Sequence, residues 1–512
     1  MIFAIHKSIL TVLGKYILNI KLRLRHEPHF YLALLAYVLI SLLGMIYSPL
    51  FDEDEGFFAE AARNMLQSGD FFSTWVNAEA RFDKPGLYFW LECLSMQLFG
   101  ISAFAVRLPS FLFFLAFIFE IYRFSERYFI KIDPKHVVFV GLGMLQFQVL
   151  SKAAVVDNAL NFFLCYALFN FYELYLSFSK GRLIKIGCAI ALGILTKGPI
   201  MVVLFFAVVG MFILYTRSFG LILKFLKPSF LLSAFLLPAV WFFVVWQRSG
   251  EALFVEFFLK HNLGRYTATM ESHGGVWYYY FPVLLLSFFP FSHLVFSAFN
   301  QKFNPLVFML ISWFVFVFVF FSFSKTQLPH YISYGYAPLL VLISNVKFNK
   351  KWPSYIQMCI LIGVLFLLPL SIRYVYNVES VGLPFTQNEF NAVFDQTYFV
   401  VAELLFVGFV FLKRFEFKWL IFISFTSLFI FKYGLLQQGF VRQIGIKLKA
   451  QKETVYMHDH YNPSLSFYAQ RSFPIQESFG ENEIHFLKLS KIDTSKVALI
   501  DSGGGFALVG TR

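Results

Sequence analysis

The sequence predicts an all-α polytopic membrane protein. Of its 512 residues, 58% are apolar and 14% are charged, whereas soluble domains carry about 25% charged residues. Seventy-two phenylalanines add apolar bulk, and the mean hydropathy is +0.66. Four apolar ranges contain no Asp, Glu, Lys or Arg and reach the roughly 20 residues that a bilayer crossing needs: 30–51, 228–247, 303–324 and 352–372.

Lysines and arginines gather in short tracts between the apolar runs, at 7–25, 123–135, 180–185, 217–227, Lys302, 347–351 and 413–418. Such tracts mark the cytoplasmic side of membrane proteins. The net charge of +13 therefore indicates topology and gives no reason to expect a nucleic-acid partner. Placing all tracts on one side gives about 13 transmembrane helices. An odd number of crossings leaves the C-terminal segment outside.

The expected crossings include two weak ones, 108–126, which contains Glu120 and Arg123, and 183–197, which is short with charged ends. The full set is 30–50, 108–126, 136–152, 158–177, 183–197, 199–216, 229–247, 278–299, 303–323, 331–346, 353–372, 397–413 and 419–438.

Two domains follow from this path. Residues 1–438 form the transmembrane domain, in which 51–107 is a long outer loop with helices expected at 55–67 and 87–105, the second at the interface. Residues 1–25 space isoleucines along one face of a basic interfacial helix. Residues 439–512 have the alternation and turns of a small α/β segment, and the context of 503–505 favours a turn over a phosphate loop.

Carboxylates stand at two boundaries of the outer face. Asp54 and Glu55 lie where the first span leaves the bilayer, and Asp157 lies in a tight turn between two spans. A solvated acidic loop and a helix cap are the ordinary explanations. Ionisable residues at a membrane edge are, however, enriched in function, so we interpret all three as candidate catalytic residues.

Basic residues of the outer face are candidates for binding phosphate. Lys84 follows Asp83 before a proline, Arg265 lies one helical turn after His261, and Lys325 ends a charge-free span. A surface ion pair and a snorkelling anchor are the competing explanations. Together these groups suit a head group that carries phosphate and sugar. A transporter or lipid flippase would place its charges near mid-membrane, and a non-catalytic subunit of the same fold stays open.

The same residues form motifs that resemble those of the GT-C polyprenyl-phosphate-sugar glycosyltransferases, over roughly residues 30–345. Within that group the chain is most similar to the bacterial 4-amino-4-deoxy-L-arabinose lipid A transferases and the protein O-mannosyltransferases. The matching motifs are Asp54-Glu55, Phe58-Ala59-Glu60, Met65-Leu66, Gly69-Asp70, Asp83-Lys84-Pro85, Tyr88-Phe89-Trp90, Arg107-Leu108-Pro109-Ser110, Asp157, Thr196-Lys197-Gly198-Pro199, His261, Arg265, Lys325 and Leu328-Pro329-His330-Tyr331.

The resemblance implies transfer of a sugar from a polyprenyl (undecaprenyl) phosphate donor to lipid A, another glycolipid, a glycan or a protein. The site would face the periplasm from the bacterial inner membrane. Asp54 would be the main catalytic carboxylate, Asp157 would support it, and Lys84, Arg265 and Lys325 would hold the donor phosphate. Asp83 and His261 match positions that can bind a divalent metal ion. Asp83 and Gln327 depart from the lipid A transferases, which have Glu and Lys there, so the sugar and acceptor stay open.

The substitution Asp54→Asn tests the catalytic assignment. We expect it to lower sugar transfer from a polyprenyl-phosphate donor in membranes by roughly 10²-fold or more, because general-base groups contribute on that scale. Unchanged transfer would refute the assignment. Intact turnover with lost movement of substrate across the bilayer would favour the transporter.

Overall fold

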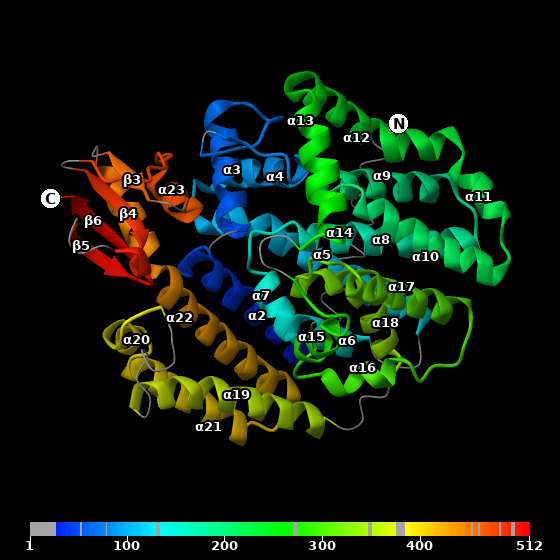
Figure 1. The fold of residues 1–512 in the computed structure, drawn as a ribbon. Coiled ribbons are helices and arrows are strands. Elements are labelled where there is room, and N and C mark those ends of the chain that lie inside the picture. Colours follow the sequence, from blue (N-terminus) through cyan, green and yellow to red (C-terminus); the bar gives the residue numbers. More distant parts are fainter. Residues whose placement is uncertain are drawn as a thin grey trace, which may run out of the picture.

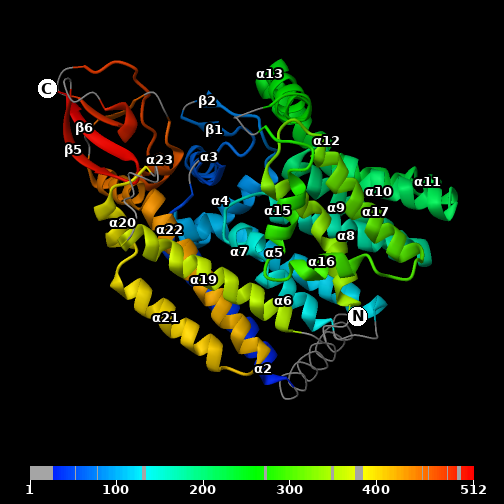
Figure 2. The same cartoon turned by 60° about the horizontal axis from the view of Figure 1, so that its bottom comes forward.

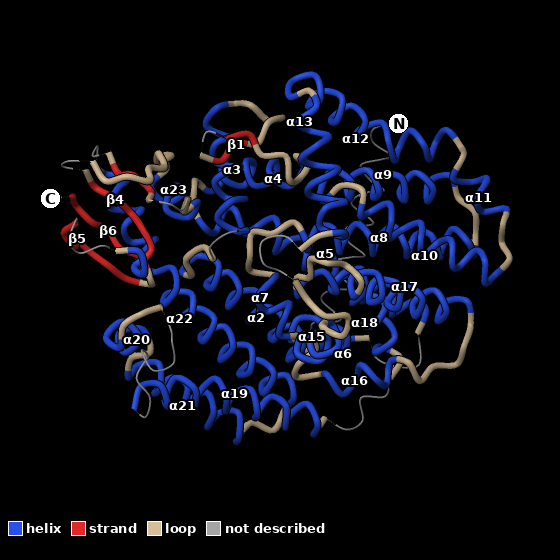
Figure 3. Tube along the Cα trace, viewed as in Figure 1, coloured by secondary structure: helices blue, strands red, loops and turns tan. Residues whose placement is uncertain are grey.

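The computed structural model describes residues 27–51, 54–77, 79–129, 134–269, 274–346, 351–374, 384–451, 454–458, 461–480, 483–492 and 497–511. The basic helix expected within residues 1–25 lies outside this part of the chain. Helices dominate what is described, and strands are confined to the outer loop and to one end of the molecule (Figures 1 and 3). The predicted all-α membrane class with a small C-terminal α/β segment is confirmed.

Within the described residues, seven helices are long and apolar enough to cross a membrane: α2 (Pro28–Tyr47), α5 (Ala103–Tyr128), α8 (Asp157–Leu176), α12 (Pro228–Ser249), α17 (Pro305–Ser322), α19 (Trp352–Tyr374) and α22 (Phe415–Ala450). Two bent pairs raise the number to nine if each is one span. They are α15 (Tyr280–Ser287) with α16 (Ser292–Ala298), bent by 111°, and α20 (Gln387–Val393) with α21 (Gln396–Phe411), bent by 45°.

The expected number of about 13 crossings is higher than this count. Range 136–152 divides into α6 (Lys135–Gly143) and α7 (Leu145–Leu150), and 331–346 holds the end of the 3₁₀ helix η2 (Pro329–Gly335) and the short α18 (Tyr336–Ser344). Ranges 183–197 and 199–216 form α9 (Lys180–Lys197) and α10 (Ile200–Thr216). The first is too polar and the second too short to count by length and composition. Both pack against other helices of the bundle, so neither needs a wholly apolar surface.

The outer loop contains the two helices that the sequence predicts. α3 (Asp54–Ser68) matches the range 55–67, and α4 (Leu87–Phe99) covers most of 87–105 before the chain turns at Gly100 into α5. A short hairpin of β1 (Trp75–Val76) and β2 (Glu79–Ala80) joins them. The remaining outer segment after α12 contains α13 (Glu251–Leu253), the π-helix η1 (Phe254–Gly264) and α14 (Arg265–Thr267), while α11 (Gly220–Phe225) precedes α12.

The C-terminal segment is a four-stranded sheet beside the end of α22 (Figure 2). Its strands, in the order β3-β4-β6-β5, are β3 (Val455–Met457), β4 (Ile484–Lys488), β6 (Phe506–Thr511) and β5 (Val497–Gly503), with α23 (Pro463–Ala469) between β3 and β4 and η4 (Leu489–Lys491) after β4. Gly504 and Gly505 have φ of +59° and +81°, as a tight hairpin turn requires. The turn predicted at 503–505 is therefore confirmed.

α23 packs against both α22 and α3, so the sheet is tied to the helix that begins with Asp54. Polar contacts reinforce this docking. Tyr461 donates a hydrogen bond to Glu60, and Arg63 lies 3.5 Å from the same carboxylate and donates to the carbonyl of Ser466. Glu60 and Arg63 are almost fully buried. Burial raises the pKa of Glu60 to about 7, although the Tyr461 hydrogen bond and the Arg63 charge oppose the rise.

This pKa predicts that docking of the C-terminal segment depends on pH. Between about pH 4.5 and 7, docked Glu60 holds a proton that the undocked, solvated carboxyl releases. Docking is therefore strongest below pH 4.5 and weakens as the pH rises through 7. We expect cleavage of the intact protein after α22 by limited proteolysis to be at least about tenfold faster at pH 7.5 than at pH 5, after correction for protease activity.

The substitution Glu60→Gln is the matched control. It keeps the shape of the side chain and removes its titration, so the rate of cleavage should become flat between these pH values. An unchanged pH dependence in this variant would show that another group controls docking.

Candidate active site

A buried ion pair joins the end of the first span to the outer loop. Arg107 of α5 binds Glu55 with both ends of its guanidinium, at 2.7 Å from Nε to Oε1 and 2.9 Å from Nη2 to Oε2. Its remaining N–H groups donate hydrogen bonds to the carbonyls of Met45 (3.1 Å), Ser48 (2.8 Å) and Pro49 (2.7 Å), which lie at and just beyond the C-terminal end of α2. Carbonyls at a helix end lack partners inside the helix, so Arg107 satisfies groups that would otherwise be unpaired.

The carboxylate of Glu55 also accepts two backbone hydrogen bonds, from Phe51 N (2.8 Å) and from Ala154 N (2.8 Å). Both of its oxygens are thus occupied, and the side chain is buried. The sequence predicts Glu55 as catalytic. Its contacts instead fit a positioning residue that ties Asp54 beside it to the loop before Asp157.

Asp157 begins α8 and is held from two other elements. Lys197, at the end of α9, lies 2.7 Å from its Oδ1. Tyr334 of η2 donates a hydrogen bond to the same oxygen, and the Nε2 atom of His330 lies 3.8 Å away. Lys197 also contacts the hydroxyl of Tyr334 at 2.6 Å. Asp157 is therefore a buried, paired carboxylate whose position depends on α8, α9 and η2 together.

Gly198 explains why the chain can place Lys197 here. It follows α9 with φ +78°, a conformation that side chains other than glycine rarely adopt. A Cβ at this position would stand 2.5 Å from the ring of Phe257 in η1. The glycine thus ends α9 and lets η1 approach the end that carries Lys197.

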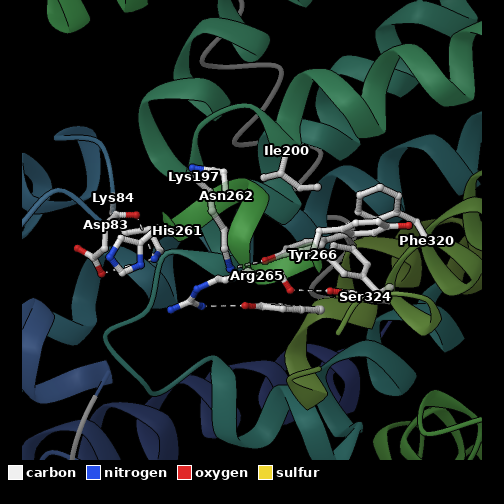
Figure 4. A pocket seen from close by; sticks show the side chains of 13 residues that line it. Asp83, Lys84, Lys197, Ile200, His261, Asn262, Arg265, Tyr266, Phe320 and Ser324 are labelled. Atoms are coloured by element: carbon white, nitrogen blue, oxygen red, sulfur yellow. Dashed lines mark hydrogen bonds and ion pairs between the residues drawn. The ribbon is translucent and has the colours of Figure 1, made fainter. Parts of the chain in front are cut away.

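A cleft of about 610 Å³ opens beside this cluster (Figure 4). Lys84, Asp83 and His261 lie at one side, Arg265 at the centre, and Tyr266 and Phe320 at the other. Lys197, Tyr331 and Tyr334 also line it. The cleft therefore has basic groups at one part and aromatic surface at another, as an anionic head group attached to an apolar chain would require.

Arg265 is fixed by its backbone and its side chain. Its carbonyl accepts hydrogen bonds from the hydroxyl of Ser324 (3.1 Å) and from Thr326 N (3.1 Å), and its Nη1 donates to the hydroxyl of Tyr331 at 2.9 Å. The turn after α17 thereby holds Arg265 in the cleft. The same turn does not bring Lys325 there: its N–H donates to the carbonyl of Tyr266, and its side chain is exposed and does not line the cleft.

Charges around Asp83 and His261 set their protonation. Burial raises the pKa of Asp83, but Lys84 and Arg81, at 3.6 Å and 3.3 Å, outweigh it and hold the pKa below its usual value. Burial lowers the pKa of His261 to about 4, although the charge of Asp83 opposes this. His261 is thus neutral and Asp83 ionised at neutral pH.

The side chains of Asp83 and His261 lie close together, as a shared metal ion would require (Figure 4). However, the described residues contain no group of three or more His, Cys, Asp or Glu side chains that could hold a metal ion. Arg81 and Lys84 already pair with the carboxylate. This donor set fits a resident metal poorly.

Asp54 is the first residue of α3, and its side chain is exposed. It lines a narrow cavity with Arg81 and Asp83, beside the main cleft. Its negative charge also reaches His330, the residue that faces Asp157. Among the three predicted catalytic carboxylates, Asp54 alone has no ion pair with a described residue.

Arg107, Lys197, His330 and Tyr334 were not among the predicted site residues. Signals for three of them were available, since Arg107, Lys197 and His330 stand in motifs that carry the family resemblance. Arg107 is a lone charge beside an apolar span, and Lys197 ends the expected span 183–197 before Gly198. Tyr334 carried no such signal, because it stands within the apolar range 331–346 and its partner is 177 residues away.

Comparisons with known proteins bear on this arrangement. Residues 83–251 match the family described as dolichyl-phosphate-mannose-protein mannosyltransferase. An uncharacterised protein of Aquifex aeolicus is 30% identical over 388 residues, covering 73% of this chain and 89% of the relative. The undecaprenyl phosphate-alpha-4-amino-4-deoxy-L-arabinose arabinosyl transferase of Wigglesworthia glossinidia brevipalpis is 28% identical over 340 residues. That match covers 63% of this chain and 60% of the relative's length.

The crystal structure of ArnT from Cupriavidus metallidurans bound to undecaprenyl phosphate has the same fold. The TM-score is 0.77 at 19% sequence identity, covering 94% of this chain and 98% of that one. Fold and family together define an integral membrane glycosyltransferase of the GT-C type.

More narrowly, the chain is a polyprenyl-phosphate-sugar glycosyltransferase that resembles the 4-amino-4-deoxy-L-arabinose transferases and the protein mannosyltransferases, and it belongs to the same family as the Aquifex aeolicus relative. It is an enzyme that uses a lipid-linked sugar. The resemblance stated from the motifs is confirmed at this level.

The pair of Asp157 and Lys197 gives a test of positioning. Lys197→Met leaves Asp157 buried without its counter-charge, which costs roughly 3–5 kcal/mol, so the thermal unfolding midpoint in detergent should fall. Asp157→Asn/Lys197→Met removes both charges and should recover most of that midpoint. We expect neither variant to recover sugar transfer. Transfer restored in the double variant would show that the charge of Asp157 is not required.

Proposed function

We propose that the protein transfers a sugar from undecaprenyl phosphate to an acceptor at the periplasmic face of a bacterial inner membrane. The names of the arabinosyl transferase relatives and the lipid bound to the Cupriavidus protein support this donor. The basic tracts at the opposite ends of the helices support the orientation.

The observation that carries the proposal is the pair of cations in the cleft, Lys84 and Arg265. Both line one cavity at the membrane boundary, beside the cluster around Asp157. A guanidinium and an ammonium bind phosphate oxygens through charge-assisted hydrogen bonds. They would hold the donor phosphate and stabilise the charge that it gains as the bond from the anomeric carbon to its oxygen breaks.

Asp54 would act on the acceptor. If the acceptor is a hydroxyl, its oxygen forms the new bond to the anomeric carbon, and Asp54 accepts the released proton as general base. If the acceptor is an ionised phosphate, no base is needed, and Asp54 would orient the reacting groups. Its exposure beside the cleft leaves it accessible for either role.

Asp157 would keep a constant negative charge at the same centre. Its oxygen is held by Lys197 and Tyr334, so it would fix the cleft wall formed by η2 and could orient the sugar. Glu55 would contribute through position alone.

The acceptor is lipid A, another glycolipid, a glycan or a protein. Residues 1–438 would provide catalysis and 439–512 a docked outer segment. α22 runs to Ala450, so the structural break follows the expected boundary by twelve residues.

Two lysines of the outer face give the sharpest test. Lys84→Gln should lower kcat/KM for the polyprenyl-phosphate-sugar donor by roughly 10²–10³-fold, on the scale of losing one preorganised stabilising donor. Lys325→Gln removes the same charge outside the cleft and should change kcat/KM by less than about threefold.

Initial rates with purified enzyme in defined lipid would measure both. Equal losses in the two variants would mean that overall surface charge attracts the donor and that the cleft does not hold its phosphate. Unchanged activity of Lys84→Gln would refute the proposed phosphate site.

A further inference from the structure

A second polar cavity lies at the end of the helix bundle opposite the cleft. It has a volume of about 740 Å³ and is lined by residues where four helices begin: α2, α6, α19 and α22. α2 runs from this cavity to the Arg107 contacts, so its 20 residues, about 30 Å, separate the two sites. This cavity is therefore no part of the catalytic centre.

The charges in this cavity favour an anion. Lys351 and Arg414 line it and form no ion pair with any described residue. Lys135 also lines it and pairs with Glu27, and Glu416 is the second acid of the wall. Two cations thus remain to face one acid, and His29 and His136 complete the polar lining.

Helix ends add to this preference. α2, α6 and α22 begin here without a side-chain cap on their first backbone N–H groups. Their helix dipoles direct partial positive charge at the cavity, and first-turn N–H groups are ready donors for phosphate or sulfate oxygens.

An apolar groove adjoins this cavity. It has a volume of about 810 Å³ and lies between α2, α5 and α6. Phe30 lines both cavities, so the two share a wall. The groove follows α2 from Phe30 to Val38, a rise of about 12 Å, which is close to half of a hydrocarbon core about 30 Å thick.

We propose that the two cavities form one site for an anionic phospholipid of the leaflet opposite the catalytic cleft. The head-group phosphate binds among Lys351, Arg414 and the uncapped helix ends. One acyl chain lies in the groove against Leu34 and Phe119. Basic pockets between transmembrane helices are known sites for acidic lipid head groups, and here the length of the groove matches one leaflet.

Native mass spectrometry of the full chain in detergent, titrated with phosphatidylglycerol and with phosphatidylcholine, tests this site. The wild type should bind phosphatidylglycerol about tenfold more tightly. Lys351→Gln/Arg414→Gln should abolish that preference. Lys185→Gln/Lys302→Gln removes two exposed lysines elsewhere and should keep it. Lys84→Gln should also keep it, because that residue belongs to the catalytic cleft.

The groove is tested separately by Leu34→Trp, which places a larger ring in it and should weaken binding of phosphatidylglycerol at least fivefold. Equal binding of both lipids by the wild type would overturn the proposal, as would equal phosphatidylglycerol binding by the two double variants. Displacement of the lipid by millimolar glycerol 3-phosphate would also overturn it, since it would indicate a site for soluble phosphate. If Leu34→Trp does not fold, the comparison of Lys351→Gln/Arg414→Gln with Lys185→Gln/Lys302→Gln decides the result alone.

Discussion

The arrangement of the active site depends on the ion pair between Glu55 and Arg107. Removing two charges from water costs several kcal/mol each, and only excellent geometry compensates. Here the guanidinium is bidentate and its other hydrogens reach backbone carbonyls at the end of α2, while the carboxylate accepts two N–H groups. Every strong donor and acceptor of the pair is used. The pair therefore fixes α2, α3 and the loop before α8 relative to one another.

The three carboxylates around this pair, those of Glu55, Asp157 and Asp54, differ in their burial and in their partners. Glu55 uses both oxygens on its partners, Asp157 is held from two other elements, α9 and η2, and Asp54 at the start of α3 is exposed beside the cleft. Burial with full pairing makes a side chain rigid but removes its capacity to exchange a proton with a substrate. The exposed member is the one suited to meet an acceptor, and its neighbours supply its position. The cations do not divide in this way: Lys197 pairs with Asp157, Lys84 pairs with Asp83, and both line the cleft.

The membrane class and the outer face could be predicted from the sequence, because a bilayer requires long apolar segments and favours basic tracts on one side. They gave the membrane class and the face on which Asp54, Asp157, Lys84 and Arg265 gather. The sequence could not separate Glu55 from Asp54, since adjacent residues in one motif differ here only by partners 52 and 99 residues away. Lys325 was predicted to bind phosphate for a related reason: it is close to the cleft along the chain, but its side chain is exposed and is not part of the cleft lining. The expected number of crossings was too high because short apolar helices that pack inside the bundle were counted as spans.

The length of α22 has a mechanical consequence. Its 36 residues span about 54 Å, while a hydrocarbon core is about 30 Å thick. The part of α22 that is longer than the hydrocarbon core leads to α23, which packs against α3. A bilayer of different thickness changes the tilt of long helices. Because α23 contacts both α22 and α3, a change in the tilt of α22 would shift α3, the helix that begins with Asp54. Membrane thickness would thereby act on the position of Asp54, alongside the chemistry of the lipids themselves.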